Sequence, residues 1–313
     1  MVGRRPLGAD AILPQLTLKI ALAQIRCEKG DWAGNLERTD QYMERAAAAG
    51  CHVIIFPEMG LSGYCDPAKF PDSVQSLDSP WVARFVELSA RHGIAASGGF
   101  IEANPHGKPF ITQVLVQGGQ IIGVYRKVHV VDEEAEWFSP GDQTPVFNLA
   151  LPRPAADEGR GPSADDGRWT MDDGVVEPVS LPPSSIVHRP SSVTCALAVC
   201  ADSDRPDLFA AFARAGARVV FHSSAPGLYG RRTDAASWQS GFDWYKSHLF
   251  ERLPAYARDN SLYIAVATQT GATVDEDFPG GSFIFAPDGS CVAGVEGYEE
   301  VMVVHQIEIQ RKT

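Results

Sequence analysis

The sequence lacks the short motifs that mark the commonest metal and cofactor sites. Its six cysteines form no Cys-x-x-Cys pair, and its eight histidines form no His-x-x-x-His or His-Glu-x-x-His pair. It contains neither a Gly-x-x-x-x-Gly-Lys-Ser/Thr phosphate loop nor a Gly-x-Gly-x-x-Gly dinucleotide fingerprint. We therefore expect no metal site, and no phosphate or dinucleotide site built on these motifs.

Positive charge and long apolar runs are also scarce. The 313 residues include 27 lysines and arginines against 39 aspartates and glutamates, a net charge of −12. Such a chain repels phosphate backbones and anionic lipids, so we expect neither nucleic acid nor a membrane as a partner. No apolar run reaches the 18 residues or so of a membrane span, and residues 1–15 have no apolar core of signal-peptide length. The sparse cysteines then predict free thiols and a cytoplasmic location.

Strand and helix patterns alternate along most of the chain. Strands are expected at 16–24, 53–56, 94–102, 111–117, 120–125, 193–200, 217–222, 262–268, 282–285, 291–295 and 300–309, and helices at 35–48, 80–92, 207–214 and 244–258. The first strand alternates apolar and polar residues, which predicts burial on one face only. This order of elements indicates an α/β fold, a mixed sheet with helices on its outer faces.

One segment breaks the pattern. Residues 153–190 are crowded with proline, glycine and aspartate and have almost no periodicity, so they are interpreted as a surface insertion. The strands on either side of it can belong to one core. The predicted organisation is an N-terminal extension, 1–15, and a single domain, 16–313, that carries this insertion.

Three ionisable residues lie at or just after the ends of predicted strands. They are Glu58, Lys127 and Cys200. Since strand ends of an α/β sheet bring distant parts of the chain together, the three side chains can share one pocket. A thiol nucleophile, a carboxylate that takes its proton and an ammonium that stabilises a substrate oxyanion form a coherent catalytic set. Taken singly, Cys200 is equally compatible with a core position, and Glu58 and Lys127 are more typical of solvated strand ends and turns; Cys195, inside its strand, is interpreted as structural.

The flanking sequences resemble the nitrilase superfamily of carbon–nitrogen hydrolases. The matching motifs are FPEMGLSGY at 56–64, YRKVH at 125–129 and VCAD at 199–202, in the order and at about the spacing of that family. The resemblance runs from about residue 19 to residue 309. It implies a four-layer αββα sandwich, no cofactor, and assembly into homodimers or larger oligomers.

The resemblance also implies a Glu-Lys-Cys triad, which here is Glu58, Lys127 and Cys200. The family has a second glutamate a few residues before a segment that reads FSPGD at 138–142 in this chain. Glu134 is the best match, with Glu133 and Glu136 as close competitors. The implied reaction proceeds through a Cys200 thioester, with the oxyanion held by Lys127 and the backbone N–H of Ala201.

The sequence after the cysteine bears on the substrate. Ala201-Asp202 stands where nitrile-cleaving relatives usually have Trp-Glu, which favours a small amide or N-carbamoyl substrate. Asp204 occupies the position of a family arginine; it either favours an amine-bearing substrate or caps the following helix. Tyr64, Trp137 and Ser224 are candidates to line the pocket, although ordinary packing explains each of them. The alternatives are a nitrile hydrolase or acyltransferase of the same superfamily, and a non-catalytic binding protein.

Overall fold

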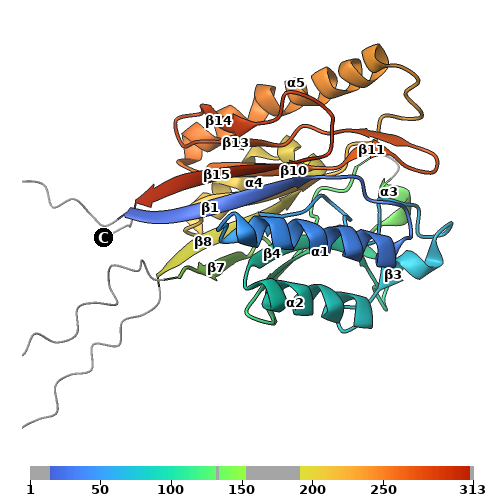
Figure 1. Ribbon diagram of the computed structural model, residues 1–313, viewed down its shortest axis with the longest axis horizontal. Helices are drawn as coiled ribbons and strands as arrows, with labels where there is room; N and C mark the ends of the chain where they lie inside the picture. Colours follow the sequence, from blue (N-terminus) through green and yellow to red (C-terminus); the bar gives the residue numbers. More distant parts are fainter. Residues whose placement is uncertain (1–14, 132–133, 153–190, 311–313) are drawn as a thin grey trace, which may run out of the picture.

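Two β-sheets stacked face to face form the centre of the molecule, and helices cover their outer faces (Figure 1). The computed structural model describes residues 15–131, 134–152 and 191–310. The predicted insertion at 153–190, and all of the predicted N-terminal extension except Gln15, lie outside these residues. The layer order, helices, sheet, sheet, helices, confirms the αββα sandwich expected from the resemblance.

The first sheet has seven strands within the described part of the chain. Their order is β15 (Val301–Gln310), β1 (Gln15–Gln24), β2 (Val53–Ile55), β4 (Ala95–Glu102), β5 (Phe110–Gln117) and β6 (Gln120–Arg126), with β3 (Val74–Gln75) beside β4. Strands β1, β2 and β4 are parallel, and β15, β5 and β6 are antiparallel to their neighbours. Helices α1 (Trp32–Ala48) and α2 (Pro80–His92) pack on the outer face.

The second sheet has six strands among the described residues. Their order is β14 (Cys291–Gly294), β13 (Phe283–Phe285), β10 (Tyr263–Thr268), β9 (Val219–Ser224), β8 (Ser192–Val199) and β7 (Val146–Ala150). Helices α4 (Pro206–Arg214) and α5 (Ala235–Asn260) lie against each other, and α5 packs on this sheet. Shorter elements are α3 (Glu134–Trp137), β11 (Thr270–Ala272), β12 (Asp277–Pro279) and two 3-10 turns, Pro71–Ser73 and Cys200–Asp204.

Strand β1 shows how the layers are held together. Leu18, Ile20 and Leu22 point into the core between the two sheets. Ala21 and Ala23 point the other way, into the core beneath the helices. The prediction that this strand is buried on one face is therefore wrong for its second half, because the helix layer covers the face that the alternation assigned to solvent. Small alanine side chains on that face leave room for the helices to pack closely.

No helix in 15–131, 134–152 or 191–310 combines the length and the apolar character that crossing a membrane requires.

Candidate active site

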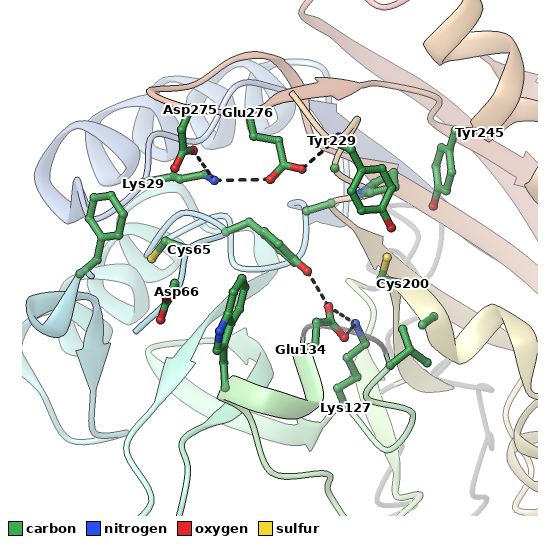
Figure 2. Close-up of a pocket in the computed structure, with 18 of the residues that line it drawn as sticks. Lys29, Cys65, Asp66, Lys127, Glu134, Cys200, Tyr229, Tyr245, Asp275 and Glu276 are labelled. Atoms are coloured by element: carbon green, nitrogen blue, oxygen red, sulfur yellow. Dashed lines mark hydrogen bonds and ion pairs between the residues drawn. The ribbon is translucent and has the colours of Figure 1, made fainter. Parts of the chain in front are cut away.

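The three predicted catalytic residues come from both sheets and meet at one end of the sandwich. Glu58 follows β2 and Lys127 follows β6 in the first sheet, whereas Cys200 follows β8 in the second. A hydrogen bond across the sheets joins the two halves nearby, since the Ser223 hydroxyl donates to the Phe56 carbonyl at 2.8 Å. Figure 2 shows the Cys200 sulfur, the Lys127 ammonium and the Glu134 carboxylate converging on one pocket.

Lys127 is the centre of a buried ionic cluster. Its Nζ lies 2.9 Å from Oε1 of Glu58. The same nitrogen lies 2.7 Å from each carboxylate oxygen of Glu134 (Figure 2). The Tyr64 hydroxyl donates to Glu134 Oε1 at 2.9 Å, and the backbone N–H of Ala225 donates to Glu58 Oε2 at 3.0 Å. Side chains of Lys127 and Glu58 are fully buried, so the ion pairs are shielded from water.

The cluster has one more negative group than positive, and the pKa values reflect this. Burial raises the pKa of Glu58 to about 7, against the opposing effect of the Lys127 ammonium and with a further contribution from Glu134. Burial alone lowers the pKa of Lys127, but the two carboxylates outweigh it and raise that pKa well above its usual value. The lysine therefore stays charged, while Glu58 can gain or lose a proton near neutral pH.

Cys200 sits at a sharp turn. It is half-buried, opens the 3-10 turn after β8, and has a backbone φ of +43°, which a residue with a side chain rarely adopts. Burial and the neighbouring Glu58 raise the pKa of its thiol well above the ordinary value, although Lys127 opposes them. The resting group is thus a neutral thiol, which needs a proton acceptor when it reacts.

Asp202 ties the cysteine turn to the lysine strand. Its buried carboxylate accepts hydrogen bonds from the Tyr125 hydroxyl at 2.7 Å and from the backbone N–H groups of Val199 and His129 at 2.8 and 3.0 Å. Tyr125 and His129 flank Lys127 by two residues on either side, and Val199 precedes Cys200. Asp202 is not among the predicted site residues, although it belongs to the VCAD motif that carries the resemblance.

Cys200 lines a pocket of about 250 Å³. Among the predicted site residues, those that line it are Tyr64, Lys127, Glu134, Trp137, Cys200, Ala201 and Asp204. Glu58 is not among the lining residues, but its carboxylate contacts the Lys127 ammonium. Of the three competing glutamates, Glu134 is the one that reaches Lys127; Glu136 is exposed, and Glu133 lies outside the described residues.

Ser224 is not in the pocket lining, contrary to its prediction as a substrate-binding residue. Its side chain is fully buried, and its hydroxyl lies 3.2 Å from Nδ1 of His222. Strand β9 continues to Ser224, two residues beyond its predicted end, so Ser224 lies on the same face of the strand as His222.

Asp204 lines the pocket but does not cap helix α4. The helix starts at Pro206 without any side-chain capping bond, and Asp204 instead pairs with Arg252 Nε at 3.1 Å. His248 Nε2 lies 3.7 Å from the same carboxylate. The Asp204 charge is therefore already balanced by a guanidinium from helix α5.

The rim of the pocket is rich in aromatic rings and paired charges. Lys29 Nζ lies 2.6 Å from Asp275 and 3.4 Å from Glu276, and Figure 2 shows this trio across the cavity from Cys200. Lys69 lies 3.9 Å from Asp66. The aromatic lining residues besides Tyr64 and Trp137 are Phe70, Tyr229, Trp244 and Tyr245. Within 15–131, 134–152 and 191–310, no group of three or more histidine, cysteine or acidic side chains is arranged to hold a metal ion.

Comparisons with known proteins agree with this geometry. The carbon-nitrogen hydrolase family model matches residues 19–312. An (R)-stereoselective amidase from a Pseudomonas species is 25% identical over 295 residues, which cover 94% of this chain and 86% of that protein. A glutamine-dependent NAD(+) synthetase of Thermotoga maritima is 28% identical over 138 residues, 42% of this chain but only 23% of the synthetase's length.

Solved structures show the same fold. A variant of the Nesterenkonia AN1 amidase from the nitrilase superfamily superimposes with a TM-score of 0.66 at 22% identity, covering 95% of this chain and 93% of that one. Another variant of that amidase, with the same score and coverage, carries the acetamide moiety of fluoroacetamide covalently added at its active-site cysteine. The family match over nearly the whole length confirms the resemblance seen in the motifs: this chain belongs to the carbon-nitrogen hydrolase family.

Proposed function

We propose that this protein hydrolyses small linear amides, with Cys200 as the nucleophile and a thioester as the intermediate. The observation that carries the proposal is the position of Cys200 in the pocket beside a buried lysine that bridges Glu58 and Glu134. Family membership supports hydrolysis of a carbon–nitrogen bond, and the Pseudomonas relative is named an amidase. The cysteine adduct in the Nesterenkonia amidase further supports a thiol nucleophile.

The first step joins the sulfur to the amide carbon. The Cys200 thiol proton moves to the Glu58 carboxylate as the sulfur attacks, and the carbonyl electron pair moves onto oxygen. Transfer of the proton to Glu58 keeps the thiol from adding a third negative charge beside two carboxylates and one ammonium. Lys127 Nζ and the Ala201 N–H are assigned to stabilise the oxyanion; one such donor is typically worth about 10²–10³ in turnover.

The second half of the reaction returns the site to its starting state. The carbon–nitrogen bond breaks as Glu58 gives its proton to the leaving nitrogen, and ammonia departs from a Cys200 thioester. Glu58 then takes a proton from water, whose oxygen attacks the thioester carbon. The carbon–sulfur bond breaks, the sulfur regains a proton from Glu58, and the carboxylic acid leaves. Glu134 and Tyr64 are assigned to hold the Lys127 ammonium in place throughout.

The pH profile of kcat/KM tests the assigned role of Glu58. This residue must be ionised to accept the thiol proton, and burial raises its pKa to about 7. We therefore expect kcat/KM to fall about tenfold per unit as the pH drops below 7, since one proton blocks the base. Ammonia release between pH 5 and 9 measures this, with circular dichroism at each pH to exclude unfolding. A constant kcat/KM from pH 8 down to pH 5 would contradict the assignment.

The charges of the pocket favour a substrate without a carboxylate. Among the described residues that line the pocket, each lysine already lies within 4 Å of an aspartate or glutamate, and no arginine is present. Asp275 and Glu276 share the single lysine Lys29, which leaves an excess of negative charge. An N-carbamoyl amino acid would bring its carboxylate into this surrounding without a free cation to pair with. Small neutral or amine-bearing amides fit better.

Three amides of similar length test both the proposed amidase activity and the preference for substrates without a carboxylate. They are hexanamide, 5-aminopentanamide and glutaramate, which end in a methyl, an ammonium and a carboxylate. We expect ammonia from the first two, and a kcat/KM for glutaramate at least about tenfold lower than for hexanamide, a modest electrostatic difference. The substitution Asp275→Asn should reduce the difference in kcat/KM between hexanamide and glutaramate. The exposed Asp259→Asn serves as the matched control.

The outcomes separate the two claims. Absence of ammonia from all three amides, with release from hexanenitrile instead, would overturn the proposed amidase activity. Release from all three with glutaramate as the best substrate would leave the activity standing and overturn only the statement about charge.

A further inference from the structure

A buried histidine lies directly behind the nucleophile and has no part in the proposed reaction. His222, on strand β9, is fully buried, and its Nε2 lies 3.0 Å from the backbone carbonyl oxygen of Cys200. Because a carbonyl can only accept, Nε2 must carry the hydrogen and donate it. Nδ1 is then the accepting nitrogen, and it lies 3.2 Å from the Ser224 hydroxyl. The two contacts together select one neutral tautomer.

The hydrogen bond from His222 to the Cys200 carbonyl also affects the orientation of the Ala201 N–H, because both groups belong to one peptide bond. The Cys200 carbonyl and the Ala201 N–H belong to the same planar trans peptide, in which the two groups point in opposite directions. A donor that holds the carbonyl from behind therefore directs the N–H to the opposite side, and Ala201 lines the pocket. The hydrogen bond also polarises the peptide and strengthens its N–H as a donor.

The backbone at this point needs such support. Cys200 has φ +43°, a left-handed conformation that costs a residue with a side chain about 1–2 kcal/mol. Strained backbone persists where the surroundings hold it. Asp202 holds the turn through Val199 and His129 on one side, and His222 holds the Cys200 carbonyl itself on the other.

We infer that His222 is a positioning residue that orients and polarises the Ala201 N–H toward the oxyanion. The inference rests on the proposed function, which assigns this N–H as an oxyanion donor. His222 touches no substrate in this arrangement and acts only through the Cys200–Ala201 peptide. Ser224 acts one step further back, since its hydroxyl can donate to Nδ1 and so supports the tautomer that the Cys200 carbonyl selects.

Two substitutions at this position separate donation from packing. His222→Leu fills similar space without a donor, whereas His222→Gln places an amide N–H about where Nε2 lies. We expect His222→Leu to lower kcat about 10–100-fold, less than complete loss of an oxyanion donor, with KM changed less than about threefold. His222→Gln should retain kcat within about fivefold. An equal loss in both variants, or wild-type kcat in His222→Leu, would overturn the inference.

A second measurement distinguishes positioning from general damage. Hexanal adds to the cysteine to form a tetrahedral adduct whose oxygen needs the same donor, whereas alkylation by iodoacetamide forms no oxyanion. In His222→Leu we expect the Ki of hexanal to rise by about the factor that kcat falls, while the rate of Cys200 alkylation stays within about threefold. Parallel loss of alkylation and turnover would show a merely structural role.

Ser224→Ala keeps the test decisive should His222→Leu not fold. It leaves the ring in place but removes the hydrogen bond to Nδ1 that supports the donating tautomer, so kcat and hexanal affinity should both fall about three- to tenfold, with alkylation unchanged. Unaltered kcat and hexanal affinity in Ser224→Ala would overturn the inference. If the wild-type protein cleaves no amide, the proposed function fails; if it cleaves amides and these variants respond otherwise, only the inference about His222 fails.

Discussion

Replacement of Cys200 by alanine is expected to lower amide turnover at least about 10⁴-fold while leaving the protein folded. The thiol is the group that forms and breaks the bond to the substrate carbon, and removal of a nucleophile of this kind leaves only binding and oxyanion stabilisation. Ammonia release measures the activity, and circular dichroism with thermal unfolding measures the fold. Turnover close to that of the wild type would end the proposed mechanism.

Another cysteine of the same sheet supplies the control. Cys195 lies five residues earlier on β8, is fully buried in the core, and has a pKa raised to about 12 by burial. Cys195→Ala should keep full turnover and lose about 1 kcal/mol of stability from the small cavity it leaves. Alkylation experiments should use a Cys291→Ser background, because Cys291 is exposed and would otherwise react as well.

Replacement of Lys127 by methionine is expected to abolish turnover and also to destabilise the fold. The change removes the ammonium that lies 2.9 Å from Glu58 and 2.7 Å from Glu134. Two buried carboxylates then face each other without a cation, which typically costs about 3–5 kcal/mol. Urea unfolding at pH 8 measures the loss, and the exposed Lys108→Met, expected within about 0.5 kcal/mol of the wild type, is the matched control.

The stability of the Lys127→Met variant should depend on pH in a defined direction. Without the lysine, burial and repulsion by Glu134 raise the pKa of Glu58 further above its value in the unfolded chain. The folded state then binds more protons than the unfolded state, so stability increases as the pH falls from 8 toward 5. A free energy of unfolding equal to that of the wild type at pH 8 would contradict the buried ionic cluster as the source of the effect.

Much of the fold was predictable because its elements have apolar periodicity. Helix α2 matches its predicted range, and β5, β6, β8 and β10 match within a residue at each end. Helix α5 begins at Ala235, nine residues before its predicted start, since residues 235–243 show no clear apolar periodicity; the Asp234–Ser237 capping box stabilises this first part of the helix. The short strands β3, β11 and β12 were missed because two or three residues show no periodicity.

The site residues that belong to a sequence motif were predictable from the sequence. Residues whose role depends on tertiary contacts were not. Glu58, Lys127, Glu134 and Cys200 all belong to quoted motifs or lie at a set distance from one. His222 gave no such signal, because a histidine in an apolar strand is indistinguishable from a core residue until its neighbours are known. The catalytic roles, the homo-oligomer implied by the family resemblance and the cytoplasmic location stay predictions.

The division of the triad between two sheets has a mechanical consequence. The first sheet carries Glu58 and Lys127 and the second carries Cys200, so the distance between the sulfur and its partners depends on how closely the two sheets pack. Tyr125 and Leu197 belong to the core between the sheets, so their size helps to set the distance between the two layers. Leu197 would thus affect the reacting distances without touching the substrate. Slight swelling of the sandwich would stretch the reacting distances while every strand remains paired, so chemistry should fail before folding does.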